Sequence, residues 1–204
     1  GYTLSSDFPL RNPIQSSRQG ISDAFAVKTN PAGDSLVWST YLGGAGAEAA
    51  YGVFLSPTGE PYLTGYTSSS DFPLKDPSQG VHGGQRDGFA AVVCSTGDSL
   101  YWSTYIGGSD DEIAYGLHLD GTSILHVTGY TASSDFPTNN PFDSTANGSQ
   151  DIFVSRLRGP NQAPIALCAD VTAYADVSCL ADATIDNGSY DPDGDPVSLE
   201  QVPP

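Results

Sequence analysis

The chain has 204 residues and a formal net charge of −17, from 24 acidic and 7 basic residues. Such an acidic surface repels nucleic-acid backbones and anionic membranes, which excludes both as partners, whereas it favours solubility and cation binding. Abundant glycine (23) and proline (15), with only 15% charged residues, are typical of many short strands joined by tight turns. No stretch approaches the roughly 20 apolar residues of a membrane helix.

A motif at the start of the chain recurs twice. GYTLSSDFPL begins at Gly1, GYTSSSDFPL at Gly65 and GYTASSDFPT at Gly129, so the period is 64 residues. Other residues keep the same phase: Asp23, Asp87 and Asp151 align, and Phe25, Phe89 and Phe153 align. A fixed period of this kind indicates a repeat architecture.

Four strand-like runs follow one another in the first repeat, at 24–29, 35–42, 51–55 and 61–67. Turns rich in proline and glycine separate them, and no stretch has helical periodicity. Four antiparallel strands per repeat predict an all-β stack of propeller-type blades, with two complete repeats and additional edge strands. Large aromatic side chains at matching positions are expected to form the core and assembly contacts: Trp38, Trp102, Tyr41, Tyr105 and Phe153.

These motifs resemble the bacterial β-propeller repeat often called SBBP. The resemblance covers residues 1–158 and includes Asp23 with Phe25, the STYLGG segment 39–44, and the GYT-SSDFP segment 65–73. It implies a secreted or cell-surface bacterial protein and brings no catalytic residues. A closed propeller takes about 4–8 blades, so closure within this chain is not expected.

The repeat ends before a linker at 159–164. The following segment, 165–204, resembles the start of an immunoglobulin-like domain of the hyalin-repeat or polycystic-kidney-disease type, through Cys168, Cys179, Asp182 and the run 186–196. A complete sandwich of that class takes about 100 residues, so this segment is expected to be a partial β-sandwich.

Cysteines and chain ends indicate the compartment. Cys168 and Cys179 are close in sequence and are expected to form a disulfide, which suits an oxidising environment. Cys94 is left over, as either a buried thiol or an intermolecular link. The chain contains no methionine and starts at Gly1, so we expect a processed piece of a longer, secreted polypeptide.

Acidic runs are candidate calcium sites, and calcium is the only cofactor that the sequence indicates. Asp191, Asp193 and Asp195 alternate around a glycine, as in the start of a calcium loop, but the distal glutamate is missing, so a plain acidic turn is the other interpretation. The run 108–112 is a weaker candidate because its counterpart at 44–48 lacks both aspartates.

Polar residues in the repeats favour structural roles. Asp7, Asp71 and Asp135 recur once per repeat, as expected of turn residues that accept backbone N–H bonds, while the following Phe-Pro anchors the loop. His118 and His126 stand where the first repeat has Phe54 and Tyr62, so they are expected to fill space.

Two sequons begin at Asn147 and Asn187 and are candidate glycosylation sites. Motifs of serine hydrolases, zinc proteases and phosphate-binding loops are missing from the sequence, so no enzymatic activity is expected.

The primary hypothesis is an extracellular structural protein that self-associates into a filament or surface layer by head-to-tail β-strand pairing. The alternative is a cell-surface adhesin or a module that binds carbohydrate or protein. A hydrolase propeller is the third hypothesis, and it requires a pocket with paired carboxylates.

Overall fold

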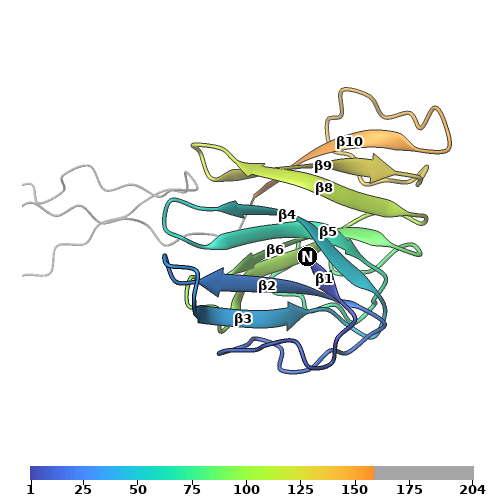
Figure 1. Ribbon diagram of the computed structural model, residues 1–204. Coiled ribbons are helices and arrows are strands. Elements are labelled where there is room, and N and C mark those ends of the chain that lie inside the picture. The colour runs from blue at the N-terminus through green and yellow to red at the C-terminus, as the bar shows by residue number, and fades with distance from the viewer. Residues whose placement is uncertain (159–204) are drawn as a thin grey trace, which may run out of the picture. The chain divides into compact units, whose positions relative to one another are not determined.

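The computed structural model describes residues 1–158, in which every regular element is a β-strand, so the all-β prediction is confirmed (Figure 1). In this part of the chain there is no helix that could cross a membrane. The strands are β1 (Tyr2–Thr3), β2 (Asp23–Thr29), β3 (Leu36–Leu42), β4 (Glu48–Leu55), β5 (Pro61–Thr67), β6 (Asp87–Val93), β7 (Leu100–Ile106), β8 (Glu112–Leu119), β9 (Ile124–Thr131) and β10 (Asp151–Arg158).

The strands form three antiparallel sheets, with the orders β1-β2-β3, β4-β5-β6-β7 and β8-β9-β10. The middle sheet therefore combines the last two strands of one repeat with the first two of the next. Both expected four-strand repeats are present in chain order, as β2–β5 and β6–β9, but each is divided between two sheets, so a sheet does not coincide with a repeat. The reason is the Gly43-Gly44 connection after β3, which takes the chain to the next sheet instead of back along the same one.

A bulge in β4 explains the glycine of the GYT motif. The pairing of β4 with β5 skips Tyr51, because Ala50 lies opposite Gly65 and Gly52 opposite Thr64. A Cβ atom on Gly65 would overlap the carbonyl oxygen of Ala49, so only glycine allows this approach. The bulge also lets the ladder continue back to Glu48, which is why β4 begins earlier than the predicted residue 51.

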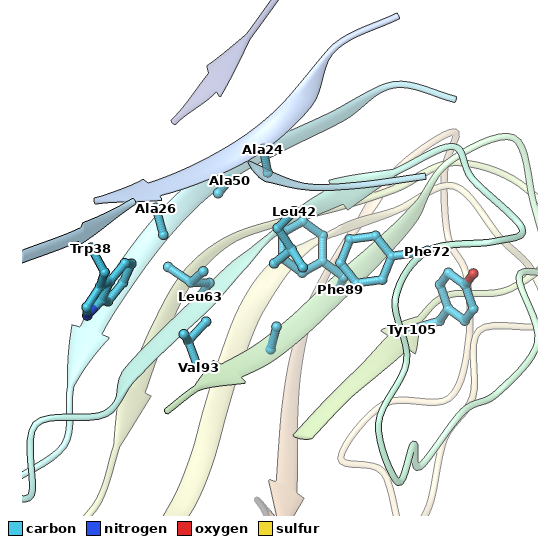
Figure 2. Close-up of a cluster of buried hydrophobic side chains, with 11 residues drawn as sticks. Ala24, Ala26, Trp38, Leu42, Ala50, Leu63, Phe72, Phe89, Val93 and Tyr105 are labelled. Carbon is cyan, nitrogen blue, oxygen red and sulfur yellow. The ribbon is translucent and has the colours of Figure 1, made fainter. Parts of the chain in front are cut away.

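The core lies between the sheets, in two layers. β6 supplies both layers because its side chains alternate: Phe89, Ala91 and Val93 face the first sheet, and Ala90 and Val92 face the third. Figure 2 shows the first layer, where side chains of the first and middle sheets meet. The middle sheet is thus covered on both faces, and each outer sheet on one.

The predicted core aromatics are all buried. Their exposed fractions are 2% for Trp38, 0% for Tyr41, 3% for Trp102, 1% for Tyr105 and 5% for Phe153. Trp38 belongs to the first layer and Trp102 to the second, so the same position of the repeat fills successive layers. The prediction that these residues form the core is confirmed.

The SSDFP segments connect neighbouring loops. Asp71 Oδ1 accepts a 2.9 Å hydrogen bond from the backbone N–H of Ala45, and Asp135 Oδ1 accepts one of the same length from Ser109. Phe72 is buried and packs on Phe89, with ring centroids 4.8 Å apart. The predicted turn and anchoring roles are confirmed at these positions.

Buried carboxylates lie where successive sheets meet. Asp23 of β2 and Glu48 of β4 are fully buried, and a Cβ atom on Gly43 would meet both. Asp23 accepts bonds from the backbone N–H groups of Gln19 and Gly20, and Glu48 from that of Gly44. Burial raises the pKa of Glu48 above its ordinary value of 4.5.

Candidate strand-pairing site

The first sheet is incomplete on its β1 side. β1 pairs with β2 at only two positions, Tyr2 with Ala24 and Thr3 with Asp23. In the middle sheet the corresponding strands, β5 and β6, pair over six positions from Tyr62–Val92 to Thr67–Asp87. Among the described residues, the stretch of β2 from Ala26 to Lys28 therefore has no neighbouring strand on this side.

Two apolar side chains next to this edge are exposed. Val53 and Leu55 of β4 are 68% and 62% exposed. Their repeat counterparts, Leu117 and Leu119 of β8, pack into the second core layer, and Leu119 is only 7% exposed. The difference arises because β4, β5 and β6 of the middle sheet all pack against β8, whereas among the described residues the first sheet meets β4 mainly through β2 and the short β1.

We call the stretch 26–28 of β2, together with Val53 and Leu55, the acceptor edge. An unpaired row of backbone N–H and C=O groups is a template for another strand. Exposed apolar side chains beside it favour a strand that carries apolar residues at alternate positions.

A second open edge lies at the other end of the stack. β10 is an eight-residue strand of the third sheet, and among residues 1–158 only β9 pairs with it. Ile152 and Val154 are 84% and 71% exposed, while their counterparts in β6, Gly88 and Ala90, are buried under the third sheet. We call β10 with these two side chains the donor edge.

A row of tyrosines crosses the middle and third sheets. Tyr51 and Tyr115 occupy the bulges of β4 and β8, and their ring centroids are 5.4 Å apart. Tyr66 lies 6.0 Å from Tyr51, and Tyr130 lies 6.2 Å from Tyr115. A bulge redirects a side chain, and here it places two large rings in solvent, 48% and 52% exposed.

An ion pair borders this tyrosine row. Arg86 donates from Nε and Nη2 to the two carboxylate oxygens of Asp111, at 3.2 and 2.7 Å, and its guanidinium lies 5.6 Å from the ring centroid of Tyr66. The Arg86 side chain holds the pKa of Asp111 below its ordinary value. Asp111 was part of the weaker calcium candidate, 108–112, and it is engaged by arginine instead.

Glu112, the last residue of that candidate, is also occupied. It is fully buried and accepts a 2.8 Å hydrogen bond from the backbone N–H of Gly108 as well as one from the Thr131 hydroxyl. Within residues 1–158, no three His, Cys, Asp or Glu side chains come together as a metal site would require.

Several predicted site residues lie outside the described residues: Asp191, Asp193, Asp195, Cys168, Cys179 and Asn187. The linker and the partial β-sandwich segment lie there as well. Asn147 is described and exposed, and its Nδ2 donates to the carbonyl oxygen of Thr145 at 3.0 Å. Its role as a glycosylation site stays a prediction.

Cys94 is a buried free thiol, the first of its two interpretations, with its Sγ 2.9 Å from Ser99 Oγ. His118 and His126 lie opposite each other in β8 and β9. His118 packs edge-on against Phe54, and His126 Nε2 is 2.9 Å from Asp120 Oδ2. Packing and local hydrogen bonding therefore account for these residues.

A groove of about 470 Å³ lies between the first and middle sheets, lined by residues that include Gln15, Gly44, Asp71 and Pro73. Asp71 is the one acidic residue in its lining, and it already accepts the Ala45 N–H.

No protein-family model matches the sequence, and no curated protein matches it either. The candidate site is therefore defined by geometry. Sequence reasoning missed Val53, Leu55 and Arg86. Val53 and Leu55 have apolar counterparts 64 positions later, so the sequence gives no sign that they are exposed. Their exposure can be recognised only when the grouping of strands into sheets is known.

Proposed function

We propose that this chain is an extracellular structural protein whose sheets are propeller-type blades and whose copies assemble head to tail. In this proposal the donor edge of one copy, β10, pairs along the acceptor edge of the next. The observation that carries it is the exposure of Val53 and Leu55, at 68% and 62%, where the repeat counterpart Leu119 is 7% exposed in the second core layer.

Two further observations support assembly. The two edges that are open among residues 1–158 differ from each other, so a contact between them is heterologous and generates rings or filaments, not symmetric dimers. The antiparallel order of four consecutive strands in the middle sheet agrees with a propeller blade. The resemblance of residues 1–158 to the SBBP repeat favours a secreted or cell-surface location.

The test uses two variants of the full chain with opposite defects. Val53→Lys/Leu55→Lys disables the acceptor edge, and Ile152→Lys/Val154→Lys disables the donor edge. Each variant alone is expected to be monomeric in sedimentation velocity, while an equimolar mixture forms a single heterodimer, because each supplies the edge that the other lacks. Val81→Lys, at a 76% exposed valine in a distant loop, is the control and assembles like the parent.

Circular dichroism establishes that the variants are folded, as expected for changes at exposed positions. A parent chain that stays monomeric at all concentrations contradicts the proposal. So does a mixture that stays monomeric while the control assembles.

A second candidate function is ligand binding at a cell surface. The exposed tyrosine row favours it, because exposed aromatic rings grouped together are typical of binding sites.

A further inference from the structure

We propose that the tyrosine row, Tyr66–Tyr51–Tyr115–Tyr130 with the Arg86–Asp111 pair beside it, binds an uncharged polysaccharide. This inference deepens the second candidate function and does not depend on strand pairing. The row stays accessible when neighbouring sheets pack together. Tyr115 is 52% exposed although the middle sheet packs against its strand, β8. A second copy that packed against β4 in the same way would therefore leave Tyr51 exposed to solvent as well.

The four tyrosine rings form one extended surface. Neighbouring rings are 5.4–6.2 Å apart and tilted by 33–41°, so together they form a continuous aromatic surface across two sheets. The backbone fixes this surface, because bulges at equivalent positions hold Tyr51 and Tyr115. A pre-organised tyrosine loses little conformational entropy on binding. Rings repeated every 64 residues suit a polymer whose units also repeat, and the C–H faces of sugar rings pack on aromatic faces.

The ion pair beside the tyrosine row carries no net charge. Arg86 and Asp111 neutralise each other through two hydrogen bonds. Burial raises the pKa of Tyr51 and of Tyr130, so their hydroxyl groups are neutral donors at pH 7. The site is therefore uncharged within a protein of net charge −17, which repels acidic polymers. The guanidinium already lies beside the Tyr66 ring, the position that a cationic ligand would need.

The experiment is native affinity electrophoresis of the full chain in gels that contain hydroxyethyl cellulose, laminarin, galactomannan or dextran, with alginate as the acidic polymer. We expect at least one neutral polysaccharide to retard the protein. Tyr51→Ala/Tyr115→Ala should weaken this retardation by about tenfold, equivalent to about 1.4 kcal/mol. Tyr101→Ala is the matched control, because Tyr101 is also 48% exposed but lies on β7, outside the row.

Four results would overturn the inference: no retardation by any of the four neutral polymers, retardation that survives the double substitution, equal loss in the Tyr101 control, or stronger retardation by alginate. Release of the retarded protein by choline at constant ionic strength would assign the row to cations and overturn it as well. Unchanged circular dichroism and thermal midpoints of the variants ensure that a loss reports on binding. Retention of polysaccharide binding by the edge variants separates this result from the assembly proposal.

Discussion

β4 and β8 occupy the same position in successive repeats and share the same bulge, yet their apolar side chains have opposite environments. Leu119 of β8 is 7% exposed because the middle sheet packs against β8, whereas Leu55 of β4 is 62% exposed. Their local sequences are alike, so the difference comes from the neighbouring sheet. In a repeat protein each element packs against its neighbours, and among the described residues β4 has less of a neighbouring sheet over Leu55 than β8 has over Leu119.

Substituting this matched pair tests the comparison most strongly. Leu119→Ala should lower the free energy of unfolding by about 2–5 kcal/mol, because it leaves a cavity in the second core layer. Leu55→Ala should change it by less than about 0.5 kcal/mol, as expected at an exposed position. Urea denaturation of dilute, monomeric protein measures both values. An equal loss of unfolding free energy in the two variants would mean that Leu55 is buried in solution.

Substituting the glycine opposite the β4 bulge is expected to have the next largest effect on stability. Gly65→Ala places a methyl group against the Ala49 carbonyl and should destabilise the chain by about 1–3 kcal/mol. Gly80→Ala is the control, since a Cβ atom there makes only an ordinary 3.6 Å contact with Pro77. Because the bulge directs Tyr51 outward, Gly65→Ala should also weaken polysaccharide retardation, whereas Gly80→Ala should not.

Lowering the pH is expected to have the smallest effect on stability, and it tests one buried carboxylate at each of the two sheet interfaces. Burial raises the pKa of Glu48 at the first interface and of Asp87 at the second above their ordinary values of 4.5 and 3.8. A raised pKa means that the folded state binds protons more readily than the unfolded state, so stability should increase as the pH falls from 7 towards 4.5.

Below about pH 3.8 stability should fall again, because hydrogen bonds hold the pKa values of Asp111 and Asp135 below their ordinary value of 3.8. Thermal midpoints at low protein concentration, recorded from pH 3 to 7, measure the effect. A monotonic fall from pH 7 downward would contradict the raised pKa values.

The sequence alone predicts the repeat, the β class and the buried aromatics, because these depend on local patterns. Trp38 and Tyr41, for example, stand in an alternating strand between clear turns. The partition into sheets could not be predicted, because β5 pairs with β6 across the long connection 68–86 while β3 does not pair with β4, and local patterns do not decide between these two pairings. The exposure of Val53 follows from that choice.

The candidate binding site was likewise only partly predictable from the sequence. The tyrosines of the row recur visibly in the sequence, but the distance of 25 positions between Arg86 and Asp111 hides their ion pair. Neither residue has a counterpart of the same type in the first repeat, where Ser22 and Ala47 stand at these positions. Periodicity could therefore not reveal this part of the site.

The middle sheet crosses the boundary between repeats, and this has a mechanical consequence. β5 and β6 come from different repeats and are joined by six paired positions as well as by the connection 68–86. Tension applied to the chain ends would therefore act on the hydrogen bonds between β5 and β6. Neither repeat could unfold completely without disrupting the middle sheet, to which both contribute strands. A single proteolytic cut in that connection would leave the two parts of the chain held together by the β5–β6 pairing.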